Sequence, residues 1–180
     1  MAKNWRTGAV WAAIVTALLA AARPAGAAQG PPAGGTGARS GVRSSSGTLR
    51  MLIDDAIDRS QAFRRLVDTI ETSDAIVYVE DSECRHKRRG CLVAVTRAVP
   101  RRMFWVRVDA RHREPDDVAA TIGHELQHVL EVVSSPTVTD NATLFLFYDR
   151  DGPRPNSFET EAAIQAGDAV RAELRRAAGR

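Results

Sequence analysis

The segment His124-Glu125-Leu126-Gln127-His128 constrains this chain more than any other feature, because it places two imidazole side chains four residues apart. On an α-helix, residues i and i+4 lie one above the other on one face, so both rings can bind a single metal ion. Glu125 lies about 100° round the helix from His124, too far round to be a ligand but beside the open position of the metal. The pattern predicts a metal site with Glu125 as the catalytic residue. The structural alternative is a surface or core helix that happens to hold two histidines.

The residues around this segment favour a helix. Pro115 suits the first turn, and Asp116 and Asp117 suit the positive end of a helix. Pro136 disfavours helical backbone at the residue before it and so predicts the end. The apolar residues gather on the side opposite the histidines: Val118, Ile122, Leu126, Val129 and Val133. One face of this helix is therefore expected to join the core and the other to carry chemistry.

A tetrahedral zinc site built on two histidines and a water still needs a third protein ligand. Residues 156–163 offer Glu159 and Glu161. On a helical wheel Glu159 shares its side with apolar residues, whereas Glu161 shares its side with polar ones. An inward carboxylate needs a partner, which favours Glu159 as the ligand. The alternative role for Glu159 is a first-turn carboxylate in a helix capped by Asn156 or Ser157.

The motif H-E-L-Q-H, followed about thirty residues later by E-T-E-A-A, resembles the gluzincin type of zincin metallopeptidase. In the branches it resembles, the third ligand is the first Glu of an E-x-x-A-D segment. The metzincin pattern is excluded, because Glu131 and Ser134 stand where that pattern has Gly and His. The resemblance covers roughly residues 115–174. Ala163 stands where the gluzincin pattern has Asp, so the partner which that Asp often supplies is missing or comes from elsewhere.

The resemblance implies a Zn²⁺ ion bound by His124, His128 and Glu159, with Glu125 as the general base that activates a zinc-bound water. It implies a zinc-dependent peptidase acting on a peptide or protein substrate, and the N-terminal pattern described below predicts that this peptidase is exported. A zinc hydrolase of non-peptide amides or esters is an alternative, as is a non-catalytic exported binding module of zincin shape. The donor that would stabilise the oxyanion is left open between two side chains, Tyr148 and His112.

The N-terminal residues predict export. Lys3 and Arg6 precede an apolar run from Ala9 to Ala22, and small residues typical of a cleavage site follow. Residues 1–28 are therefore expected to be a signal peptide, since the apolar run is shorter than the about 20 residues of a membrane-spanning helix. A tether formed by the uncleaved segment is the alternative. Residues 29–47 are rich in Gly, Pro, Ala and Ser, which predicts a flexible linker before one domain at 48–180.

The charge of the chain gives no reason to expect a nucleic-acid partner. Five of the 25 basic residues precede residue 48, which leaves 20 basic residues against 22 acidic ones in the domain. Because the domain is nearly neutral, the basic isoelectric point of the whole chain is no argument for nucleic-acid binding. No stable membrane insertion is expected after cleavage of the signal peptide, and the oligomeric state stays open.

Cys84 and Cys91 are the two cysteines of the chain, and they enclose a strongly basic segment. In an exported protein this spacing predicts a disulfide that closes a short loop between strands. A metal site made with His86 is the alternative, although two sulfurs and one imidazole at this spacing suit a metal poorly. The basic loop is expected to be solvated, or to select acidic substrates or anionic surfaces.

The remaining pattern predicts an α+β fold. Residues 52–70 have helical spacing with a break near Ser60, and residues 75–79, 91–95 and 103–108 have the composition or alternation of strands. Residues 140–148 are ambiguous between helix and strand. Because the strands follow one another without intervening helices, we expect a short antiparallel sheet packed against the motif helix, an N-terminal helix and a C-terminal helix, as in a small zincin-like domain.

Overall fold

The computed structural model describes residues 41–151 and 159–179. The expected signal peptide and most of the expected linker lie outside these residues. The strands are β1 (Val42–Arg43), β2 (Ala75–Asp81), β3 (Gly90–Ala98) and β4 (Arg101–Val108). The helices are α1 (Gly47–Arg59), α2 (Gln61–Glu71), α3 (Pro115–Val133), α4 (Asn141–Asp151) and α5 (Glu161–Ala178), with a 3-10 turn, η1 (Arg85–Lys87). Among the helices described, none combines the length and apolar character needed to cross a lipid bilayer.

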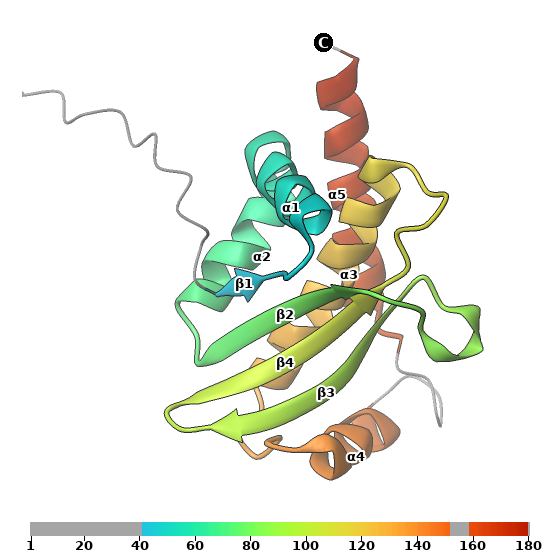
Figure 1. The fold of residues 1–180 in the computed structure, drawn as a ribbon. Coiled ribbons are helices and arrows are strands. Elements are labelled where there is room, and N and C mark those ends of the chain that lie inside the picture. Colours follow the sequence, from blue (N-terminus) through green and yellow to red (C-terminus); the bar gives the residue numbers. More distant parts are fainter. Residues whose placement is uncertain (1–40, 152–158, 180) are drawn as a thin grey trace, which may run out of the picture. The chain divides into compact units, whose positions relative to one another are not determined.

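The α+β class is confirmed, but the sheet is mixed rather than wholly antiparallel (Figure 1). Its strand order is β1-β2-β4-β3, and only the β3–β4 pair is antiparallel. The expectation of an antiparallel sheet assumed that strands adjacent in sequence are adjacent in space. Instead, residues 82–89 carry β3 to the edge, so β4 returns between β2 and β3 and lies parallel to β2. Strand β3 is consequently an edge strand of the sheet.

The folded domain begins earlier than the sequence suggested, because β1 lies within the expected linker at 29–47. Val42 is buried and pairs with Val77 of β2, and the Ser44 hydroxyl donates a hydrogen bond to the Val79 carbonyl over 2.6 Å. A strand of two residues has no detectable alternation. It is held by pairing with β2, so its composition could not reveal it.

The helices form close to the segments that the sequence predicted, although α5 begins at Glu161 and so leaves Glu159 outside it. Ser60 is the break in the N-terminal helical segment: it ends α1 and caps α2, its hydroxyl accepting a hydrogen bond from the Phe63 amide. The ambiguous segment at 140–148 is helical and belongs to α4, which packs beside β3. Helices α1, α2 and α3 contact the sheet, and α5 packs along α3 (Figure 1). The motif helix is therefore held between the sheet and the C-terminal helix.

Arg102 of β4 fixes the end of the motif helix. Its buried guanidinium forms a bidentate ion pair with Asp74, and it also donates to the carbonyls of Val132, Val133, Ser135 and Val138. The last carbonyls of a helix have no partner within it, and a cation there also favours the negative end of the helix. One side chain of the sheet thus satisfies the C-terminal end of α3.

We expect Arg102→Met to lower the free energy of unfolding by about 3 kcal/mol, because it leaves several buried carbonyls and the Asp74 carboxylate without their donor. Arg101→Met is the matched control, since Arg101 is the exposed neighbour on the same strand. Chemical denaturation of both variants measures the difference. Equal losses in the two variants would contradict this role of Arg102.

Candidate metal centre

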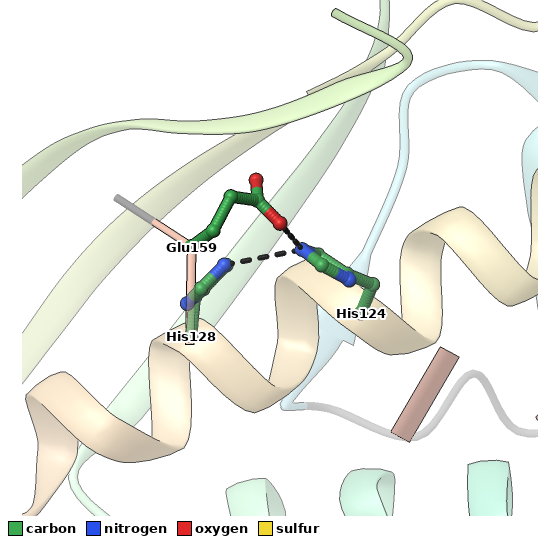
Figure 2. Close-up of side chains that lie close together, drawn as sticks. All are labelled: His124, His128 and Glu159. Carbon is green, nitrogen blue, oxygen red and sulfur yellow. Dashed lines mark hydrogen bonds and ion pairs between the residues drawn. The ribbon is translucent and has the colours of Figure 1, made fainter. Parts of the chain in front are cut away.

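The helix α3 presents both motif histidines on one face (Figure 2). Pro115 is its first residue, and the apolar residues predicted for the opposite face are buried, with Val133 partly so. The Nε2 atoms of His124 and His128 lie 3.2 Å apart. The segregation of core and chemical faces that the spacing predicted is therefore present in the fold.

Glu159 completes a group of three possible metal ligands. Its Oε2 lies 3.4 Å from Nε2 of His124, and one ligand atom from each of the three residues lies within 4.8 Å of the others (Figure 2). Atoms bound to one tetrahedral ion at about 2.0–2.1 Å are roughly 3.3–3.4 Å apart. The 3.2 Å between the two nitrogens and the 3.4 Å between Nε2 of His124 and Oε2 of Glu159 fit such an ion. Within the described residues, His124, His128 and Glu159 form the group that could hold a metal.

Glu159 joins the group of possible ligands as predicted, but the prediction that it lies on the buried face of a helix is wrong. Helix α5 begins at Glu161, and Thr160 is its N-cap, with a hydroxyl that accepts a hydrogen bond from the Ala163 amide. Glu159 therefore precedes the helix and is about half exposed, so a helical wheel does not apply to it. Glu161 instead accepts a hydrogen bond from Gln165 along α5. Asn156 and Ser157, the caps considered from the sequence, lie outside the described residues.

Two glycines allow α5 to bring Glu159 to the histidines. A Cβ atom at Gly167 of α5 would lie 3.2 Å from both the Ala120 carbonyl oxygen and Cβ of His124. A Cβ atom at Gly123 of α3 would lie 2.9 Å from a methyl of Val170. Both distances are tighter than ordinary side-chain contacts, so the helices approach this closely because neither residue has a side chain. The N-terminal end of α5 is thereby held beside the motif.

Glu131 connects the second histidine to the start of α5. Its carboxylate accepts a hydrogen bond from Thr160 over 2.6 Å and lies 3.0 Å from Nδ1 of His128. Burial alone would raise the pKa of Glu131, but the hydrogen bonds with His128 and Thr160 lower it. A carboxylate that accepts from Nδ1–H leaves Nε2 of His128 unprotonated and available to a metal. The sequence left this supporting carboxylate unidentified. Its position three residues after His128, on the same helical face, was the available signal.

The charges around the histidines favour a cation. Burial alone would lower the pKa of His124, but a hydrogen bond with Glu159 and the nearby carboxylates of Glu125 and Glu131 raise it. The pKa of Glu159 is lowered by its hydrogen bond with His124, by the imidazoles and by the charge of Arg88. A group of carboxylates that stabilises a protonated imidazole also stabilises a metal ion in the same place. The electrostatics therefore agree with the ligand geometry.

Glu125 lies beside this group and is almost fully buried. Burial raises the pKa of its carboxyl to about 7, against the opposing effect of the two imidazoles. A Cβ atom at Gly90, the first residue of β3, would lie 2.6 Å from Glu125 Oε1. Gly90 therefore leaves the space that the carboxylate occupies. Its position next to Cys91 gave no sign of this contact in the sequence.

A cleft of about 730 Å³ opens onto Glu125, His128 and Glu159. The loop between β2 and β3 and residues 92–94 of β3 line its other sides. Cys84 and Cys91 are joined as a disulfide, as expected, which rules out the alternative metal site with His86. Disulfides are typical of proteins in oxidising, exported compartments.

The two candidate oxyanion donors differ in position. Tyr148 lines the cleft, but it is buried and its hydroxyl donates to the backbone carbonyl of His128 over 3.2 Å, with its ring edge-on to that imidazole. Burial also raises its pKa. His112 is exposed in a turn with φ of 55° and does not line the cleft. Tyr148 thus supports the backbone of the motif helix, and His112 is not part of the site.

Comparisons of the chain with known proteins gave no match to a family model, to a curated protein or to a solved structure. The geometry of the site is therefore the basis on which its function is inferred.

We expect Glu131→Ala to weaken binding of a divalent transition-metal ion by about 10- to 100-fold, because His128 loses the carboxylate that orients it and Thr160 loses its acceptor. Glu131→Gln retains an acceptor without the charge and should fall between this variant and the unmodified protein. Competition with a chromogenic chelator measures the affinities. Unchanged affinity in Glu131→Ala would show that Glu131 does not support the site.

Proposed function

We propose that this chain is an exported, zinc-dependent peptidase of the gluzincin type. The observation that carries the proposal is the convergence of His124, His128 and Glu159 beside a buried carboxylate. This carboxylate, that of Glu125, lines a cleft together with His128 and Glu159. Two imidazole nitrogens and one carboxylate oxygen suit Zn²⁺, whereas Mg²⁺ and Ca²⁺ prefer ligand sets made of oxygen alone. When bound in such a site, Zn²⁺ polarises a carbonyl group and makes water acidic enough to react near neutral pH.

Glu125 has the properties of a general base in this reaction. Its pKa of about 7 lies where a carboxyl group can both accept and return a proton near neutral pH. The charge of a metal ion nearby would lower this value. We infer that Glu125 takes a proton from the attacking water and then donates it to the nitrogen of the leaving amine. The carboxylate lies against Gly90 and forms a hydrogen bond with the Leu92 backbone, and Glu125 lines the cleft.

A peptide substrate is supported by the edge of the sheet. Strand β3 lies at this edge, and residues 92–94 border the cleft that holds Glu125. An extended peptide can add to an exposed strand edge through main-chain hydrogen bonds. A peptide bound along β3 in this way would pass beside the three ligand residues, which places a scissile bond near the base.

The purified full chain should bind one zinc ion, and Glu159→Ala should release it whereas Glu161→Ala should not. Glu159 supplies the ligand oxygen, but Glu161 is exposed on α5 and bonded to Gln165. Elemental analysis of the dialysed proteins measures zinc together with iron and other transition metals. Equal zinc loading in the two variants would overturn the assignment of Glu159, and iron in place of zinc would overturn the choice of metal.

We expect Glu125→Gln to reduce peptide hydrolysis by at least about 100-fold while zinc content and fold stay nearly unchanged. Glutamine keeps the shape of the side chain and removes its basicity. The rate is measured on a broad peptide library, with esters and non-peptide amides assayed in parallel. Full activity of this variant would show that Glu125 is not the base. Turnover of esters or amides alone by the unmodified protein would identify a hydrolase other than a peptidase.

A further inference from the structure

The loop closed by the disulfide carries a concentration of positive charge. Between Cys84 and Cys91 stand five basic or imidazole side chains and one glycine, with no acidic residue. All five of these side chains are exposed: Arg85, His86, Lys87, Arg88 and Arg89. A surface of one charge on a nearly neutral domain attracts ligands of the opposite charge. The position of the loop determines which ligands can use it.

Two arginines of the loop face the cleft of the candidate metal centre. Arg85 and Arg88 line it together with Glu125 and Glu159, whereas Lys87 and Arg89 do not. Arg88 is close enough for its charge to act on Glu159. A ligand that reaches the candidate metal centre from this side therefore passes the guanidinium groups of the loop.

These two arginines differ in their partners from Arg107 and Arg111 nearby. Arg107, which also lines the cleft, is paired with Glu80, and Arg111 is paired with Glu83 and Asp109. Among the described residues, neither Arg85 nor Arg88 forms an ion pair. Each guanidinium thus keeps its planar set of donors, which matches the two oxygens of a carboxylate.

The loop is held in place from both ends. The disulfide joins its ends, the Arg89 carbonyl accepts a hydrogen bond from the Asp109 amide, and Cys84 lies against the Arg107 carbonyl. The backbone amide of Arg88 also bonds to the Arg85 carbonyl, which keeps the two arginines on one turn. Groups fixed before the ligand arrives lose little conformational freedom on binding, so they select more strongly than mobile ones.

We propose that Arg85 and Arg88 form a carboxylate-binding subsite, which makes the enzyme select peptides with a carboxylate close to the scissile bond. The inference rests on the proposed peptidase function and extends it to a substrate class. The carboxylate belongs either to an Asp or Glu side chain or to the C-terminus of the peptide. An anionic membrane surface would contact the whole exposed loop. A peptide in the cleft would contact Arg85 and Arg88, which line it, and this position favours the peptide.

The first test compares peptides that differ by one charge. The zinc-loaded full chain is assayed on a series in which Glu replaces Gln at each position around the cleaved bond, with free and amidated C-termini. We expect kcat/KM to rise by at least about tenfold for a carboxylate at one position, as for a charge-assisted hydrogen bond. A gain from Glu identifies a side-chain subsite, and a gain from the free C-terminus identifies a terminal one. Hydrolysis with no preference for either carboxylate would overturn the proposal.

Two double variants remove the same charge from different sides of the loop. Arg85→Gln with Arg88→Gln should abolish the preference for the carboxylate, measured within each variant as the ratio of kcat/KM for the Glu peptide to kcat/KM for the Gln peptide. Lys87→Gln with Arg89→Gln is the matched control and should keep the preference, because these side chains do not line the cleft. An equal loss in both double variants would show a general effect of charge and would overturn the subsite.

A binding measurement separates this proposal from the proposed function. Fluorescence anisotropy on zinc-loaded Glu125→Gln compares labelled Glu and Gln peptides without turnover. One outcome is that the unmodified chain hydrolyses no peptide, yet the acidic peptide binds more tightly than the neutral one and loses this advantage when Arg85→Gln and Arg88→Gln are added. That outcome would overturn the proposed peptidase function and support the carboxylate-binding subsite. If that pair of substitutions affects only sedimentation with vesicles of phosphatidylglycerol, the loop binds membranes and the subsite is overturned.

Discussion

The close packing of α5 on α3 is the constraint on which the candidate metal centre depends. Two histidines on α3 provide neighbouring nitrogens, but Glu159 belongs to a segment 31 residues after His128, and only the position of α5 brings it near. That position requires Gly123 and Gly167, since a side chain at either would meet the facing helix. Packing that appears purely structural therefore sets the distance between the ligand atoms.

Glu131 makes the same connection through polar contacts. It orients His128 on its own helix and holds Thr160, the residue that caps α5 and follows Glu159. One carboxylate thus contacts a candidate ligand on α3 and the residue that follows the other candidate ligand, Glu159, at the start of α5. This support comes from α3, and the part-buried hydrogen bond from Thr160 to Glu131 links α3 to the start of α5.

The features that could be predicted from the sequence are those that depend on neighbouring residues alone. The four-residue spacing of the histidines, Pro115 at the first turn and the pairing of Cys84 with Cys91 each needed no knowledge of distant contacts. The features that could not be predicted are those in which the position of a strand or side chain depends on contacts across the whole fold. The parallel pairing of β4 with β2 depends on the path of residues 82–89, and Glu159 joins the site from outside a helix rather than from a buried helical face.

The disulfide loop and the candidate base are parts of one structural unit. Cys91 follows Gly90, and Gly90 pairs with Val108 of β4 while leaving space for the Glu125 carboxylate. The loop that carries the arginines therefore also forms one wall around the base. Burying a carboxylate is costly unless polar partners compensate, and here the imidazoles and the Leu92 amide provide part of that compensation. Burial by this wall raises the pKa of the Glu125 carboxyl. The carboxyl group nevertheless lines the same cleft as Arg85 and Arg88, so the fold places the candidate base and the arginines of the loop around one space.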